Sequence, residues 1–216
     1  MGKITGLERT EDLPEKVLLL YDAVVQLIAE GEDMSNIKVS LIAQRAGIGK
    51  GTAYDYFESK EDIIACAIAY LLKKVTEEIH RRLMSIDSFQ DQMNYLLDMT
   101  EEKLSEQQCF LRFVHLMTDT SAISQLLRDK VGREQIEKYL PVSTLKTVLK
   151  KAQEEGEIRD DLPMDYMVYA VFLRMVTYMA FISVEEGTGK RTEEMRPFIF
   201  RGLMEEFRPR QADLEK

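Results

Sequence analysis

Apolar residues recur at spacings of three and four along nearly the whole chain, which is the periodicity of one face of an α-helix. In the segment 13–30, for example, Val17, Tyr21 and Ile28 share one face. Gly31 follows this segment and is suited to end a helix. No stretch shows the strict apolar–polar alternation of a β-strand, and the chain has only 5 prolines. The pattern therefore predicts an all-α protein.

The periodic segments are separated by short breaks, several of which contain glycine or proline. Asp12 can cap the first segment, with Pro14 in its first turn. Ser59 is placed to cap a long helix, because Asp62 three positions later completes an acidic form of the capping box. About nine helices are expected in total, from ten periodic segments, namely 13–30, 39–46, 50–56, 59–84, 87–105, 108–118, 121–137, 141–155, 162–185 and 191–207.

The segment 41–57 has the pattern of a helix-turn-helix. Ala43 is small enough to let two short helices cross closely, and Gly47 accepts the positive φ of the turn between them. Four apolar residues are spaced to face inward against the first helix, namely Ile42, Ala46, Ile48 and Ala53. The alternative is a helical hairpin inside a core, but this does not explain why so many polar and aromatic side chains occupy the second short helix.

In a helix-turn-helix, the N-terminal turns of the second helix meet base edges and phosphates. Lys50 can donate to guanine, and Gly51 lets the main chain approach DNA closely. Lys60 lies at the start of the next helix, where free N–H groups favour an anion. Asp55 repels phosphate, so it either points away or accepts from a cytosine amino group. The candidate DNA contacts are Lys50, Gly51, Thr52, Tyr54, Tyr56 and Lys60.

The net charge of −9 argues at first against a nucleic-acid partner. Its distribution changes that picture, because residues 34–60 carry +2 and the rest of the chain carries −11. Phosphate contact depends on local charge, so a cationic patch on an acidic body is compatible with DNA binding.

The same segment resembles the signature of the TetR family of helix-turn-helix transcriptional regulators. Its elements are the pairs Ile42-Ala43, Ala46-Gly47 and Gly51-Thr52, then Tyr54-Asp55-Tyr56-Phe57 and Ser59-Lys60-Glu61. The resemblance implies a DNA-binding domain over 1–60 with three helices, joined to a larger helical bundle over 61–216 for ligand binding and dimerisation. It also implies base or phosphate contacts at the six candidate residues.

Two positions depart from the family pattern. Lys38 and Val39 stand where the family often has threonine at the start of the first short helix, although Ser40 can substitute as a phosphate contact. Gly49 stands where the turn often has serine, which removes another donor.

Residues 164–184 are apolar nearly all round, so this helix must be covered on two sides. A membrane span is disfavoured because Arg174 at its centre costs about 2.5–3.5 kcal/mol on insertion scales. We expect a homodimer interface instead, formed by the helices near 162–185 and 191–207. The family resemblance implies the same arrangement, with two recognition helices set to bind a palindromic operator in double-stranded DNA.

The larger bundle is rich in methionine and aromatic residues, which adapt to varied apolar ligands. Six side chains on two helices are candidates for an apolar pocket, namely Phe110, Phe113, Met117, Tyr166, Tyr169 and Phe172. Ordinary core packing is the alternative for each of them.

The chain has no glycine-rich phosphate loop, nucleophile elbow or His-Glu-x-x-His motif, so we expect no enzyme activity. The two histidines are too isolated for a metal site, and no cofactor is expected. The starting residues lack the apolar run of a signal peptide, and Cys66 and Cys109 suit a reducing cytoplasm.

The family resemblance implies a cytoplasmic repressor that releases its operator when a small apolar or aromatic ligand binds, and the sequence is equally compatible with an activator. Two alternatives stay open: a DNA-binding regulator without an effector, and a helical ligand-binding protein that no longer binds DNA.

Overall fold

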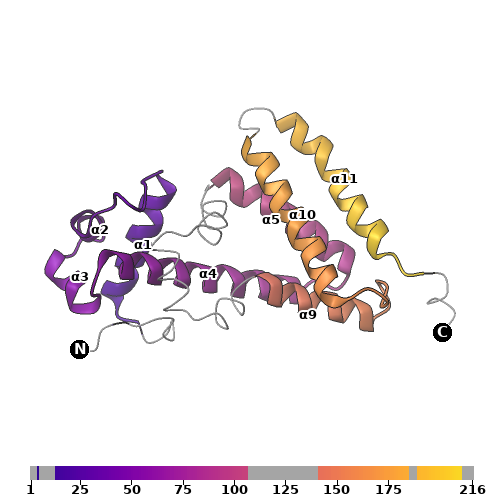
Figure 1. Cartoon of the computed structure of the whole chain (residues 1–216), viewed down its shortest axis with the longest axis horizontal. Coiled ribbons are helices and arrows are strands. Elements are labelled where there is room, and N and C mark those ends of the chain that lie inside the picture. The colour runs from indigo at the N-terminus through magenta and orange to yellow at the C-terminus, as the bar shows by residue number, and fades with distance from the viewer. Residues whose placement is uncertain (1–3, 5–12, 107–140, 185–188, 211–216) are drawn as a thin grey trace. The chain divides into compact units, whose positions relative to one another are not determined.

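The computed structural model describes residue 4 and residues 13–106, 141–184 and 189–210 (Figure 1). Every regular element in these ranges is an α-helix, as predicted. The helices are α1 (Glu15–Ala29), α2 (Val39–Arg45), α3 (Lys50–Tyr56), α4 (Lys60–Met84), α5 (Phe89–Glu106), α9 (Pro141–Glu154), α10 (Met164–Val184) and α11 (Gly189–Phe207). The helices predicted at 108–118 and 121–137 lie outside the described residues.

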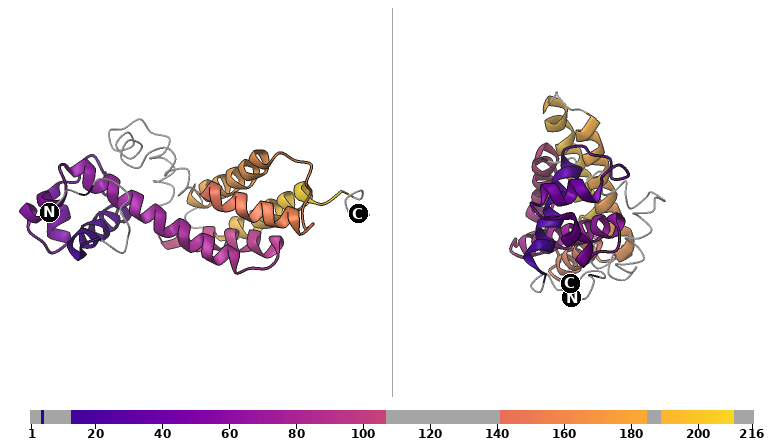
Figure 2. Two further views of the ribbon diagram at one scale, coloured as in Figure 1. Left: turned by 90° about the horizontal axis from the view of Figure 1, so that it is seen from below. Right: turned by 90° about the vertical axis from the view of Figure 1, so that its left-hand side faces the viewer.

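The described residues form two compact units, and the limit between them falls inside α4, after Val75. The first unit holds α1, α2 and α3 with the first part of α4, and Figure 2 shows these helices grouped together. The second unit holds the end of α4 with α5, α9, α10 and α11. The architecture is therefore a three-helix N-terminal module and a larger C-terminal helical bundle.

The first unit is closed by an aromatic cluster that links three parts of the chain. The ring of Tyr21 on α1 lies 6.0 Å from that of Phe57, which follows α3, and 5.3 Å from that of Tyr70 on α4. Ile42 and Ala53, predicted to face inward, are fully buried. Ala43 and Ala46 are buried as well, whereas Ile48 is only partly buried.

Local chemistry sets the helix ends of this unit. Gly47 adopts a φ of 67° in the turn between α2 and α3, as its lack of a side chain allows. The capping box before α4 is confirmed, because the Asp62 N–H donates to Ser59 Oγ and the Ser59 N–H donates to Asp62 Oδ2, both at 3.1 Å. The predicted start of α1 is wrong by two residues. Pro14 is its N-cap, with an extended ψ of 142°, and its carbonyl accepts the N–H of Val17.

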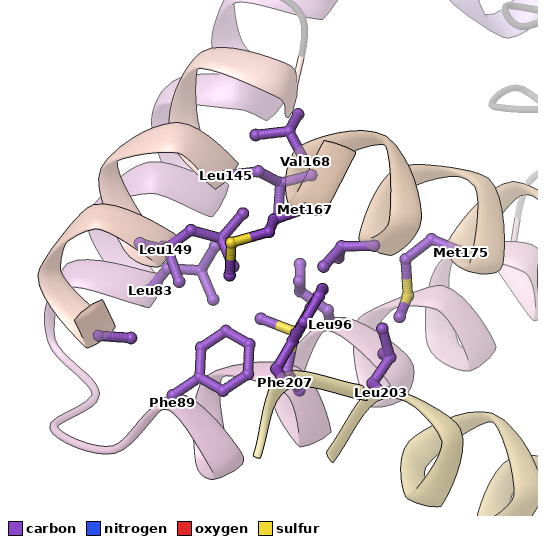
Figure 3. Packing of buried hydrophobic residues seen from close by; sticks show 14 of the residues in the cluster. Leu83, Phe89, Leu96, Leu145, Leu149, Met167, Val168, Met175, Leu203 and Phe207 are labelled. Carbon is purple, nitrogen blue, oxygen red and sulfur yellow. The ribbon is translucent and has the colours of Figure 1, made fainter. Parts of the chain in front are cut away.

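The second unit is built on one apolar cluster, part of which is drawn in Figure 3. Phe89 at the start of α5 packs against Phe207 at the end of α11, with ring centroids 6.0 Å apart. The other labelled members come from α4, α5, α9, α10 and α11, namely Leu83, Leu96, Leu145, Leu149, Met167, Val168, Met175 and Leu203. Burial of this apolar area is the main force that holds the five helices together.

The helix α10 is apolar on two sides, as the sequence predicts. Among the described residues, only its segment 164–182 is long and apolar enough to cross a membrane. Met167, Val168 and Val171 on one side are fully buried in the cluster. Leu173 on another side is 57% exposed. One apolar side of α10 is thus buried in the core of the second unit, and the other apolar side is exposed.

A polar network joins α5, α10 and α11 beside this cluster. The hydroxyl of Tyr178 donates to Glu101 Oε1, which also accepts from Arg196 Nη1 at 3.0 Å. Arg196 forms a second ion pair with Asp98. Burial and the Glu101 carboxylate together raise the pKa of Tyr178 well above the ordinary value of 10.0.

This raised pKa predicts that the wild-type protein loses stability at alkaline pH and that a Tyr178→Phe variant loses less. Above pH 10.0 the unfolded tyrosine ionises while folded Tyr178 stays neutral, so each further pH unit removes up to about 1.4 kcal/mol. Below pH 10.0 the contribution is fully present. Urea unfolding of the wild type and of Tyr178→Phe from pH 8 to about pH 11 gives the free energy of unfolding of each protein. Subtracting the two values at each pH removes the contribution of the other tyrosines, which both proteins share. Parallel pH profiles would contradict the prediction.

Candidate nucleic-acid interface

The helix α3 divides into a buried side and an exposed side. Ala53 and Tyr56 lie three positions apart and pack into the first unit. Four residues on the other side are exposed, namely Lys50, Gly51, Tyr54 and Asp55, and Thr52 is half-buried. Lys50 Nζ lies 5.8 Å from the ring centroid of Tyr54, so the two side chains form one surface. This exposed side presents a cation, an open main-chain position and an aromatic ring together.

A hollow of about 440 Å³ adjoins this surface, within the first unit. Its wall is formed by the start of α2 and the loop before it, the N-terminal turns of α3 and the first residue of α4. The lining residues are Ser35, Asn36, Ile37, Lys38, Val39, Ser40, Lys50, Tyr54 and Lys60. Three of them are lysines and none is acidic, so the hollow is locally cationic although the chain as a whole is acidic.

Lys60 is held in this wall by the main chain of the loop. Its Nζ donates to the carbonyl of Ser35 at 2.7 Å and lies 3.6 Å from Glu61 Oε1. Asp33 shapes the same loop, because its Oδ1 accepts the N–H of Ser35 at 2.9 Å and this hydrogen bond lowers the pKa of the Asp33 carboxyl. Lys60 therefore joins α4 to the loop before α2, a link that the sequence did not predict.

Arg45 is paired within the module. Its guanidinium donates two hydrogen bonds to the Glu30 carboxylate, at 2.6 and 2.8 Å, and these hydrogen bonds lower the pKa of Glu30. This fork joins the end of α1 to the end of α2. Arg45, one of the four cations of the 34–60 segment, is therefore neutralised by Glu30 within the first unit.

The structure brings together four of the six candidate DNA contacts as accessible groups, namely Lys50, Gly51, Thr52 and Tyr54. Lys60 adjoins them in the hollow. Tyr56 differs, because its side chain is only 7% exposed and packs inside the first unit. The contact proposed from its hydroxyl stays a prediction, and the packing role of its ring is the finding.

Sequence reasoning missed Ser35 and Asn36, which line the hollow. The signal that points to them is the short polar stretch after Gly31, just before the predicted start of a helix. Lys38 and Val39, which depart from the family pattern, and Ser40, which can substitute for the missing threonine, also line it.

The candidates for a ligand pocket are not brought together by the described residues. Phe110, Phe113 and Met117 lie outside the described ranges. Tyr166 and Tyr169 on α10 are 51% and 55% exposed, whereas Phe172 packs against the core of the second unit. Within the described part of the chain, no three His, Cys, Asp or Glu residues are grouped to hold a metal ion.

Large apolar side chains are exposed on two neighbouring helices of the second unit. We call this set the α10–α11 surface, and its members are Tyr166, Tyr169 and Leu173 on α10 and Phe198 on α11, which is 67% exposed. Glu206 on α11 joins the two helices, because its carboxylate accepts from the Tyr166 hydroxyl and from Arg174. Exposed apolar side chains mark an interaction site where they form one contiguous patch.

A Gly51→Ala substitution is expected to raise the stability of the protein and to lower its affinity for DNA. A Cβ placed on Gly51 meets nothing within 4 Å, so Gly51→Ala fits the free protein. Alanine is the better helix former, so the free energy of unfolding should rise by about 0.5–1 kcal/mol. If α3 approaches DNA closely, the same methyl group should lower DNA affinity about tenfold. Urea unfolding and fluorescence anisotropy measure the two effects, and unchanged DNA affinity would show that this main-chain position stays clear of DNA.

Comparison with known proteins agrees with this geometry. Residues 20–66 match the family model "Bacterial regulatory proteins, tetR family". The chain is 25% identical over 171 residues to the fatty acid metabolism regulator protein of Bacillus subtilis (strain 168). This alignment covers 79% of this chain and 80% of that protein.

Solved structures share the fold. The transcriptional regulator FadR from Bacillus subtilis, solved in complex with stearoyl-CoA, aligns with a TM-score of 0.68 at 18% identity over 87% of this chain and 97% of that one. The fatty acid degradation regulator FadR from Bacillus halodurans aligns with a TM-score of 0.70 at 22% identity over 89% and 96%. The segment 20–66 is therefore similar to the helix-turn-helix of the TetR family of bacterial regulatory proteins, and the chain shares its overall fold with solved regulators of this kind.

Proposed function

We propose that this chain is a cytoplasmic repressor that binds a palindromic operator as a homodimer and releases it when a fatty acyl ligand occupies the larger unit. The observation that carries the proposal is the lysine-lined hollow beside the exposed side of α3. DNA phosphates supply the negative charge that such a hollow attracts, and α3 supplies side chains for base edges.

The hollow and α3 divide the work of recognition. Lys38, Ser40 and Lys60 in the hollow contact the phosphate backbone and set the position of the module on DNA. Lys50 and Tyr54 lie at the border between hollow and helix, so they contact both backbone and bases in the major groove. Thr52 and Gly51 lie on the same helix and approach the DNA with them, and Tyr56 supports α3 from inside.

The α10–α11 surface supports the homodimer. Four large apolar side chains are exposed there, and a two-fold axis would bury each of them against its counterparts. The dimer would present two copies of α3 about 34–36 Å apart, one for each half of a palindromic site. Tyr166 and Tyr169 belong to this surface, so we assign them to the interface in preference to a ligand pocket.

The acyl ligand is supported by the relatives. The names of the similar regulators refer to fatty acid metabolism or degradation, and one of them was solved with stearoyl-CoA. The second unit is rich in methionine and aromatic side chains, which accommodate an acyl chain. Phe110, Phe113, Met117 and Phe172 stay the proposed lining, within a ligand-binding and dimerisation domain over 61–216.

The helix α4 provides the link between ligand and DNA. It begins at Lys60 in the wall of the hollow, and Leu83 near its other end is part of the apolar cluster of the second unit. A ligand that repacks the second unit would move α4 and change the spacing of the two α3 helices. Ligand and operator then weaken each other by the same factor, because coupling between two sites is reciprocal.

The test begins by selecting DNA from a random-sequence library with the full-length protein. We expect a palindromic duplex to be enriched, and its binding by fluorescence anisotropy to fall steeply with salt. Stearoyl-CoA should weaken this binding and raise the melting temperature, whereas coenzyme A alone should do neither. Enrichment without any effect of stearoyl-CoA or of triclosan, an unrelated aromatic probe, would favour a regulator without an effector. No enrichment would contradict DNA regulation itself.

A further inference from the structure

Residue 4 lies at the C-terminal end of the recognition helix α3. The main-chain N–H of Ile4 donates a hydrogen bond to the carbonyl of Tyr56, the last residue of α3, at 2.9 Å. The side chain of Ile4 is only 4% exposed. Ile4 is therefore joined to the DNA-binding unit by its main chain and is also buried by its side chain, although it precedes α1 in the sequence.

The end of α3 needs such a partner. The last four carbonyls of an α-helix receive no hydrogen bond from within the helix. In many helices a glycine in the left-handed conformation follows the last turn, and the main-chain N–H groups there donate to these carbonyls. Here Phe57 follows α3 in an extended conformation, with φ −127° and ψ 154°, so this kind of cap is absent. The N–H of Phe57 donates to Ala53 at 3.0 Å, and Ile4 provides the donor for Tyr56.

A helix of this length depends on its surroundings. α3 has 7 residues, fewer than an isolated helix needs to be stable in water. Its N-cap, Gly49, makes no side-chain hydrogen bond. Contacts at its C-terminal end therefore contribute directly to where the helix lies in the unit.

We infer that Ile4 is a positioning residue for DNA recognition, one that holds the end of α3 and so sets how far its exposed side chains reach into the major groove. The inference rests on the proposed DNA-binding function. Ile4 is buried, so it acts through α3 and does not touch DNA. Its loss should weaken binding to the preferred sequence, which depends on helix placement, more than binding to unrelated DNA, which depends mainly on charge.

The experiment uses two variants of the full chain. Ile4→Pro removes the N–H donor and keeps an apolar side chain, whereas Ile4→Val keeps the donor and most of the side chain. Both are titrated by anisotropy against the duplex enriched by the wild-type protein and against a shuffled duplex of equal length. A stoichiometric titration measures the active fraction of each protein, which separates misfolding from a change in affinity.

We expect Ile4→Pro to lower affinity for the enriched duplex about tenfold and affinity for the shuffled duplex less than about twofold, with the active fraction unchanged. Ile4→Val should bind like the wild type. Three results would overturn the inference: unchanged affinity of Ile4→Pro, an equal loss for both duplexes, or a lower active fraction whose remainder binds normally. If the wild-type protein enriches no duplex, the proposed function fails first and the inference with it, before any variant is made.

Discussion

A Leu173→Glu variant is expected to be monomeric and to lose most of its operator affinity. Leu173 is 57% exposed on the α10–α11 surface, so the free chain tolerates a polar side chain there. In a two-fold dimer the substitution enters the interface twice and places two like charges where apolar groups meet. We expect the dimer dissociation constant to rise at least about 100-fold, equivalent to about 2.7 kcal/mol.

Sedimentation velocity over a range of concentrations measures the change in assembly, and anisotropy measures the change in DNA binding. Leu19→Glu is the matched control, because Leu19 is also an exposed leucine but lies on α1 in the first unit. We expect this control to keep the oligomeric state of the wild type. A wild-type protein that is monomeric at all concentrations, or a Leu173→Glu variant that stays dimeric, would place the interface elsewhere or remove it.

The second large effect is expected from Lys50→Glu. Lys50 belongs both to the exposed side of α3 and to the lining of the hollow, so the reversed charge would face phosphates and base acceptors together. A well-formed base contact is worth about 1–3 kcal/mol, and a homodimer loses it in both half-sites. We therefore expect operator affinity to fall at least about 100-fold, with a weaker dependence on salt concentration.

Lys150→Glu is the matched control, which separates the effect of where the charge lies from the effect of the net charge. Lys150 is an exposed lysine on α9 that pairs with Glu154 at 3.7 Å, and its replacement changes the net charge by the same amount. Only a small, uniform loss of affinity is expected from it. If the two variants weaken binding equally, the lysine-lined hollow has no special role and general electrostatics accounts for the binding.

The features that the sequence predicted correctly are those decided within a few residues. Gly47 marks the turn because only its own main chain is involved, and Ser59 with Asp62 forms a box three residues long. The helices follow from periodicity for the same reason. The open side of α10 was also predictable, because Leu173 belongs to an apolar run too wide for one core.

The features that the sequence did not predict depend on contacts between distant positions. The bond from Lys60 to the carbonyl of Ser35 has no signature, because a main-chain carbonyl is present at every residue. Tyr56 was interpreted by its hydroxyl, but the packing of α3 beside Ala53 places its ring inside. Ile4 is a single apolar residue among polar neighbours, so no periodicity points to its burial.

The division of α3 into two sides has a consequence for how such a regulator changes its targets. Ala53 and Tyr56 keep the helix in the fold, while Lys50, Gly51 and Tyr54 take no part in that packing. Substitutions on the exposed side can therefore accumulate without a cost in folding, and operator preference can drift or be transplanted between homologous proteins. The stability of this module and the DNA sequence that it reads are then separately evolvable traits.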